Sequence, residues 1–222
     1  MRCVTAFSVE SLLDNTIVLP PPRINVFHCK TNCSLFRKHY LRGDIPCGKL
    51  FANNQTKITT YLKWKVPFSE LDIFYHLPLF FEGLSENLST YHELAIHGIF
   101  DLLHFGNPDQ IVSCIPQLIL PMRRALNTKN ICCIISTMKA LHKLVMIGEN
   151  IGPALVPYFR QILPIFNLFR SKNICIGDHI DYNGQIGDFI DQTLQILEYY
   201  GGPDAYINIK YVIPTYESCI MN

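Results

Sequence analysis

The sequence predicts an all-α protein built from stacked helical repeats, and three observations carry that prediction. From residue 68 onward, apolar residues recur at helical spacing. The pairs Leu77-Pro78, Leu120-Pro121 and Leu163-Pro164 follow one another at intervals of 43 residues. Each pair lies in an apolar run and is followed by a turn and a second amphipathic segment. This period is typical of HEAT and armadillo repeats, so we expect a HEAT/armadillo-like solenoid with a short irregular or β-leaning N-terminal segment.

The chain divides into two regions. Residues 1–30 contain Pro20-Pro21-Pro22 and are expected to form a flexible N-terminal arm. Residues 31–222 are expected to form a single helical domain, beginning with a short helix near 33–41 that Gly43 and Pro46 end. Within it, residues 47–66 lack a helical period and contain a polar turn at 53–55, which predicts a loop or a hairpin.

Three amphipathic helices are predicted in the rest of the chain. The first begins at a capping box formed by Thr90 and Glu93 and ends at Gly106 and Pro108. The second spans about 129–147, and the third spans about 186–200 before Gly201-Gly202-Pro203. The apolar stripes that predict them are Tyr91, Leu94, Ala95, Ile99, Leu102 and Leu103; Ile131, Ile134, Ile135, Met138, Leu141 and Val145; and Ile186, Phe189, Ile190, Leu194 and Leu197.

Composition limits the classes of function. The 222 residues are 49% hydrophobic and 17% charged, which is typical of a folded chain. The net charge is only +1, whereas proteins that neutralise phosphates have a basic excess, so no nucleic-acid partner is expected. The uncharged stretch 110–122 contains two prolines and is shorter than the ~20 residues of a membrane-spanning helix, so no membrane association is expected.

Candidate chemical motifs are incomplete. His92 and His97 flank a Glu, but they are five residues apart, and a shared zinc ion requires a spacing of four on one helical face. The cluster of His28, Cys29, Cys33, His39 and Cys47 lacks the second Cys pair of a zinc site. Cys132-Cys133 lies in an apolar stripe, and Asp178 and Asp181 lack the further acids of a calcium loop. We therefore expect no catalytic residues, no metal and no cofactor, and a protein that is not an enzyme.

The C-terminal part of the chain resembles a known family. The segments 154–164 (ALVPYFRQILP) and 205–219 (AYINIKYVIPTYESC) are similar to the parkin co-regulated gene (PACRG) protein family. The segment 77–84 (LPLFFEGL) and the residues around Asp178 and Gly201-Gly202 fit the same pattern. The resemblance runs from about residue 37 to 222, whereas residues 1–30 and 50–62 depart from it.

The resemblance implies a non-enzymatic helical-repeat protein of the cytoskeleton, located in the axoneme of cilia and flagella. Family members lie at the inner junction of doublet microtubules, where the B-tubule closes onto the A-tubule. The implied partners are α/β-tubulin, a small β-sandwich inner-junction protein and other microtubule inner proteins. A soluble helical-repeat scaffold or adaptor that binds other proteins without microtubules is the alternative, and a metal enzyme built on the N-terminal Cys/His cluster is a third reading.

Partner contacts are expected at basic and aromatic residues and at one acidic residue of the tail. The candidates are Arg37, Lys38, Arg42, Trp64, Arg123, Arg124, Tyr211, Tyr216 and Glu217. For the Tyr-rich tail a second interpretation stays open, in which the segment packs onto the last repeat instead of a partner.

Overall fold

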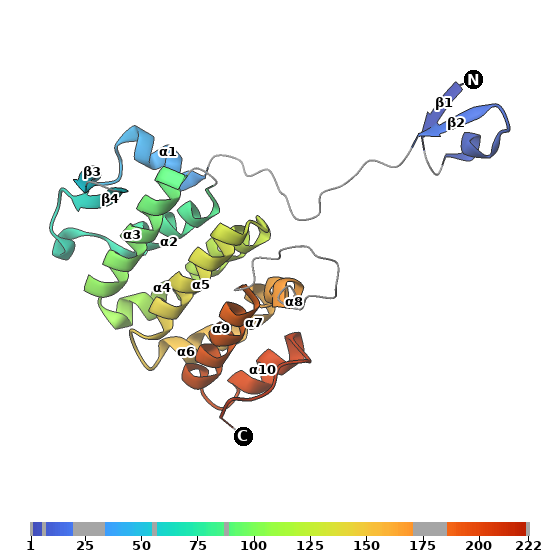
Figure 1. Cartoon of the computed structure of the whole chain (residues 1–222). Helices are drawn as coiled ribbons and strands as arrows, with labels where there is room; N and C mark the ends of the chain where they lie inside the picture. The colour runs from blue at the N-terminus through green and yellow to red at the C-terminus, as the bar shows by residue number, and fades with distance from the viewer. Residues whose placement is uncertain are drawn as a thin grey trace.

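The computed structural model describes residues 2–5, 8–19, 34–54, 57–86, 89–170 and 186–220. The described chain is mostly helical with a few short strands, which confirms the predicted class (Figure 1). Near the N-terminus, β1 (Arg2–Thr5) pairs in parallel with β2 (Thr16–Leu19), and a 3-10 turn at Val9–Leu12 lies between them. The extent of the flexible arm stays a prediction, since residues 20–33 lie outside the described residues.

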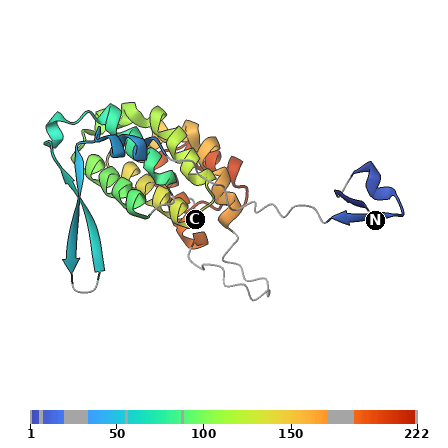
Figure 2. The ribbon, with the colours of Figure 1, turned by 90° about the horizontal axis from the view of Figure 1, so that it is seen from above.

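The first elements of the main body are a short helix and a two-stranded ribbon. Helix α1 (Leu35–Arg42) begins at Ser34, whose side chain accepts from the Arg37 backbone N–H, and ends at Gly43 in the left-handed region with φ 84°. Strands β3 (Cys47–Asn54) and β4 (Lys57–Trp64) are antiparallel. Of the two predicted alternatives for this region, a loop or a hairpin, the structure has the hairpin, and Figure 2 shows it running away from the helices.

The remaining helices follow in chain order. They are α2 (Ile73–Glu82), α3 (Ser89–Phe105), α4 (Pro108–Asn127), α5 (Ile131–Val145), α6 (Ile151–Leu155), α7 (Phe159–Ile162), α8 (Pro164–Arg170), α9 (Ile186–Gly201) and α10 (Ala205–Val212). Single 3-10 turns lie at Phe68–Glu70, Gly83–Ser85 and Val156–Tyr158.

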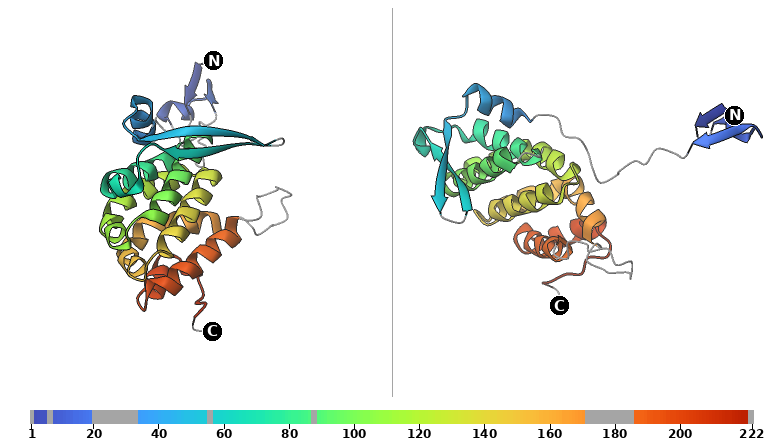
Figure 3. Two further views of the ribbon diagram at one scale, coloured as in Figure 1. Left: turned by 90° about the vertical axis from the view of Figure 1, so that its left-hand side faces the viewer. Right: turned by 45° about the horizontal axis from the view of Figure 1, so that its top comes forward.

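The helices form two packed layers (Figures 1 and 3). In the first layer α2 packs on α4, and α4 packs on α6 and α7; in the second, α3 packs on α5, and α5 packs on α9. The predicted stripes face the interface between the layers, where Leu94, Ile134 and Leu194 are fully buried. One continuous apolar core runs through both layers.

Hydrogen bonds between a histidine and a hydroxyl group link successive helices of the second layer. His92 Nε2 of α3 lies 2.9 Å from Ser136 Oγ of α5. His142 Nε2 of α5 lies 2.8 Å from Thr193 Oγ1 of α9. The same kind of polar contact thus recurs at both steps of this layer, inside an otherwise apolar contact zone.

The Leu-Pro pairs are not equivalent in the structure. Leu77 and Leu163 are fully buried, whereas Leu120 is 52% exposed and its neighbour Pro121 is buried instead. Pro78 and Pro121 lie inside continuous helices, and Pro164 begins a new one. A shift of one residue rotates a side chain by about 100° around a helix, so equal spacing of the pairs does not produce equal packing. The layers are observed, but the three pairs do not repeat one structural position.

Helices α6 and α9 approach each other closely. A Cβ atom on Gly152 would lie 2.0 Å from the backbone carbonyl oxygen of Tyr200. Only glycine leaves room for this backbone contact, which brings the first-layer helix α6 against the C-terminal end of α9.

Candidate partner-binding surfaces

The predicted contact residues fall into separate groups at different ends of the molecule. Helix α1 and the ribbon lie at one end of the stacked helices, and α10 lies at the other (Figure 1). The predicted residues of α1 and the ribbon therefore cannot share one small site with those of the C-terminal tail.

Helix α1 exposes most of its basic residues. Lys38 and Arg42 are exposed. Arg37 is half-buried because its guanidinium lies 5.1 Å from the ring centroid of Tyr91, a distance at which a cation and an aromatic face attract each other. Lys38 and Arg42 can therefore meet a partner directly, while Arg37 also holds α1 against α3.

Trp64 lies at the base of the ribbon and is packed against the core. Its Nε1–H donates to the carboxylate of Asp101 at 2.9 Å, and its ring lies 5.4 Å from Phe68 and 5.5 Å from Phe80. Trp64 is half-buried, so it anchors the ribbon and offers only an edge to a partner. The Asp101 carboxylate of α3 is thus engaged within the fold.

Of the two predicted arginines on α4, one is free to meet a partner and the other is paired within the fold. Arg123 is exposed. Arg124 binds the carboxylate of Glu82 and so joins α4 to α2 within the first layer. Arg123 is the better candidate for an intermolecular contact.

The C-terminal tail packs onto the body, which was the second interpretation offered for it. The side chain of Tyr216 is 2% exposed, so it cannot supply the surface contact expected of it. Tyr211 is 69% exposed and lies under the guanidinium of Arg160 at 4.7 Å. Glu217 is exposed, so these two residues remain available at this end.

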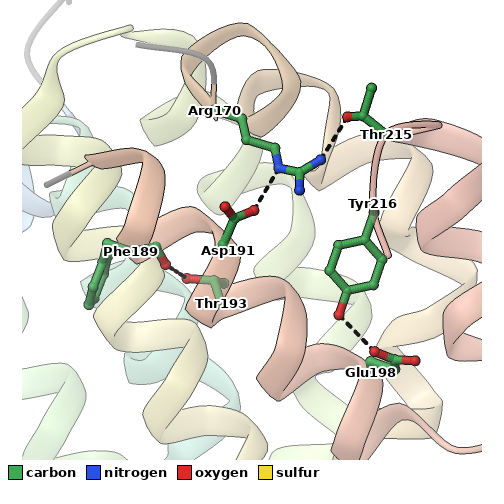
Figure 4. Close-up of polar contacts among 7 residues, drawn as sticks. All are labelled: Arg170, Phe189, Asp191, Thr193, Glu198, Thr215 and Tyr216. Carbon is green, nitrogen blue, oxygen red and sulfur yellow. Dashed lines mark hydrogen bonds and ion pairs between the residues drawn. The ribbon is translucent and has the colours of Figure 1, made fainter. Parts of the chain in front are cut away.

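Glu198 is the reason the tail packs down. This residue of α9 is 3% exposed, and its carboxylate accepts from the Tyr216 hydroxyl at 2.7 Å (Figure 4). It also accepts from the Ser218 hydroxyl and from the Cys219 backbone N–H at 3.0 Å. We call Glu198 and these three tail residues the C-terminal clasp. Nearby, Arg170 joins Asp191 at 2.6 Å and Thr215 at 2.7 Å, which fastens the start of the tail.

The clasp shifts the acidities of its members. Burial by itself raises the pKa of Glu198, but the hydrogen bonds from Ser218, Cys219 and Tyr216 outweigh it, and the pKa lies below its ordinary value. Burial and the adjacent carboxylate raise the pKa of Tyr216. Glu198 is thus held as an anion and Tyr216 as a neutral donor.

The role of Glu198 was not predicted from the sequence, although a signal was present. Glu198 lies four residues after Leu194, on the buried stripe of α9, where an acid has no place without donors. The donors come from the tail, and no spacing rule connects them to Glu198.

An open groove lies where α3, α4 and α5 meet. It has a volume of about 720 Å³ and is lined by Phe100, Asp101, Leu103, His104, Gly106, Pro108, Lys143, Met146 and Ile147. Met146 in this lining is 53% exposed, and Phe105, which lies in the sequence between the lining residues His104 and Gly106, is 58% exposed. The groove is partly apolar and open, which suits a protein segment better than a small molecule.

The structure describes some of the residues that form the incomplete chemical motifs. His92 is buried and His97 is exposed, which confirms that they occupy different helical faces. His39 pairs with Asp44 at 2.9 Å, and burial raises the pKa of Cys47 to about 11. His28, Cys29, Cys33, Asp178 and Asp181 lie outside the described residues. Within the described ranges, no three His, Cys, Asp or Glu side chains are grouped to hold a metal ion.

Membrane insertion has no support in the helices that the structure describes, because none combines the length and the apolar character needed to cross a bilayer.

Comparison with known proteins agrees with the resemblance in the sequence. The family model described as Parkin co-regulated protein matches residues 34–218, from the N-cap of α1 to the clasp serine. The mouse (Mus musculus) Parkin coregulated gene protein homolog is 45% identical over 221 residues, with 97% of this chain and 90% of the mouse protein covered. The likeness therefore extends beyond the span from residue 37 to 222. The chain belongs to the Parkin co-regulated protein family.

Proposed function

We propose that the chain is a structural, microtubule-binding protein of axonemal doublet microtubules that bridges the A- and B-tubules at the inner junction. Family membership over residues 34–218 is the observation that carries the proposal. The proposed location is the cytoskeleton of the cilium or flagellum. The proposed partners are α/β-tubulin, the small β-sandwich protein of the junction and other microtubule inner proteins.

The described surface is compatible with a bridging role. Exposed basic residues such as Arg42 lie at one end, and the exposed Tyr211 lies at the other. A protein that joins two tubules needs contact surfaces on more than one side, and these groups offer them. We further propose that the two layers are a short HEAT/armadillo-like solenoid, whose stacked helices leave long faces free for partners.

The protein is proposed to act by binding alone. The family description names no catalytic activity. The polar groups of the clasp are used within the fold, and the contacts expected at a tubulin lattice depend on shape and apolar anchors more than on net charge.

Co-sedimentation of the full chain with taxane-stabilised microtubules tests this function. We expect saturable binding that persists at moderate salt and after protease has removed the acidic tubulin tails. Bovine serum albumin is the control for trapping in the pellet. No binding under any of these conditions, with or without the junction partner added, would reject the proposal.

The groove between α3, α4 and α5 favours the second candidate, a scaffold or adaptor that binds other proteins without microtubules. In that case we expect Met146→Glu to abolish binding of the adaptor's partner while leaving microtubule co-sedimentation unchanged.

A further inference from the structure

The net charge of +1 conceals a strong separation of charge along the chain. Residues 35–66, which form α1 and the ribbon, contain seven Lys and Arg and a single Asp, a net charge of +6. All other residues together therefore carry −5. The basic residues of this segment are Arg37, Lys38, Arg42, Lys49, Lys57, Lys63 and Lys65.

Four positive charges of this segment are not neutralised by the residues that the structure describes. Lys38, Arg42, Lys63 and Lys65 are exposed, and none of the four forms an ion pair with another described residue. The only acid, Asp44, is paired with His39. Two acids follow the ribbon, Glu70 and Asp72, and Asp72 is engaged in capping α2.

The backbone keeps α1 and the base of the ribbon together. The Asp44 N–H donates to the carbonyl of His39 at 3.1 Å, and the Lys65 N–H donates to the carbonyl of Pro46 at 2.9 Å. Ile45 between them is buried. The end of α1 and the last residues of β4 are thus fixed to one short segment, and the ribbon extends the basic region away from the body (Figures 2 and 3).

Apolar groups accompany the charges. Leu41 beside Arg42 is 63% exposed, and Tyr75 of α2 is 47% exposed and lies across from His39, with ring centroids 6.2 Å apart. A purely solvated basic face does not need exposed Leu and Tyr side chains within it, whereas a peptide-binding face uses them as anchors.

We infer that α1 and the β3–β4 ribbon form a docking surface for an acidic polypeptide segment, namely the glutamate-rich C-terminal tail of tubulin. This inference rests on the proposed function for the identity of the partner and adds a second, electrostatic contact to the contact of the body with the lattice. The tail is short, flexible and acidic, so it can follow the ribbon and neutralise its charges.

The charge on the rest of the molecule distinguishes this partner from nucleic acid. A long phosphate backbone extends past a local basic patch and meets the remaining −5, which repels it. A short acidic peptide ends within the patch. The surface therefore favours a peptide, and nucleic acid is an outcome that the experiment must exclude.

The test measures fluorescence anisotropy of a labelled tubulin-tail peptide with the full chain at low salt. The test variant is R42Q/K63Q/K65Q, and the matched control is R2Q/K139Q/R160Q, which removes the same charge from exposed residues outside the segment. We expect the test variant to weaken peptide binding about tenfold, because each exposed charge pair contributes a few-fold, and the control to change it less than about twofold. Circular dichroism confirms that both variants are folded.

Two results would overturn the inference: equal loss in both variants, or a DNA duplex that binds more tightly than the peptide and is lost in the same test variant. Co-sedimentation with microtubules that lack the tails distinguishes failure of the docking surface from failure of the proposed function. If the wild type sediments with tail-less microtubules but does not bind the peptide, the docking surface is rejected and the lattice contact stands. If the wild type binds the peptide but sediments with neither kind of microtubule, the inner-junction role is rejected.

Discussion

At the scale of one residue, Glu198 holds the C-terminal tail against the fold through hydrogen bonds. A buried carboxylate without donors destabilises a protein strongly, but here a tyrosine, a serine and a backbone N–H satisfy it. Because all three donors come from residues 216–219, the anion is stable only while the tail is in place.

The variant Glu198→Gln should lower the free energy of unfolding by about 3 kcal/mol. The amide keeps the size of the side chain but turns one acceptor into a donor that faces other donors. Urea unfolding followed by circular dichroism measures the change. Glu217→Gln is the matched control, since Glu217 is exposed, and should change stability by less than about 0.5 kcal/mol.

Wild type and Glu198→Gln should also differ in how their free energy of unfolding depends on pH. The pKa of Glu198 is lowered in the folded state, so its contribution is present above the unfolded pKa and is lost as pH falls through the folded pKa. We expect the gap between wild type and Glu198→Gln to be constant near neutrality and to narrow below about pH 4. A gap that widens in acid would contradict this account of the clasp.

At the scale of elements, the close approach of α6 to α9 depends on the absence of a side chain at Gly152. Gly152→Ala places a methyl group against the Tyr200 carbonyl oxygen, which is backbone and cannot rotate away. We expect a loss of about 2–3 kcal/mol in the free energy of unfolding, measured by urea titration.

Gly148→Ala is the control for this substitution. Its added Cβ would meet Pro108 at 3.5 Å, an ordinary contact distance. A neutral or slightly stabilising effect is expected, because alanine reduces the freedom of the unfolded chain. Equal losses in the two variants would mean that the α6–α9 contact is looser than described.

The elements themselves were largely predictable, and the reasons are local. The stripes around Leu94, Met138 and Leu194 predicted α3, α5 and α9, since helical periodicity is a property of neighbouring residues. The polar turn at 53–55 predicted either a loop or a hairpin, and the ribbon is the second of these alternatives. The exposure of Leu120 was not predicted, because the orientation of this side chain depends on how α4 packs against α2 and α6. No local sequence pattern encodes that packing.

Among the candidate contact residues, the exposure of the charged side chains was predictable from the sequence, whereas the burial of the aromatic side chains was not. Lys38, Arg42 and Arg123 are exposed, as expected for charged residues of short basic runs. Tyr216 is buried because of a carboxylate eighteen residues earlier in the chain, and Trp64 is half-buried because of an aspartate on α3. Both partners are distant in sequence, so only the fold reveals them.

At the scale of the whole molecule, the two histidine–hydroxyl contacts make the second layer sensitive to acid. Burial lowers the pKa of both His92 and His142, so each is neutral in the fold but accepts a proton more readily when unfolded. Their contribution to stability is complete above the unfolded pKa of about 6.5 and declines as pH falls below it.

We therefore expect the melting temperature to fall between pH 7 and pH 5, and the variant H92Q/H142Q to flatten that slope. Differential scanning calorimetry across this range measures it. His97→Gln, at an exposed position of α3, should keep the wild-type slope. An unchanged slope in the double variant would show that other groups control the acid response.

The C-terminal clasp also has a consequence for the gene that encodes this protein. Here a stop at the codon for Tyr216 would delete Tyr216, Ser218 and Cys219 together, and the Glu198 carboxylate would lose all three of these donors. Such an allele should behave as a loss of the folded protein, and a cell carrying it should contain little of the product.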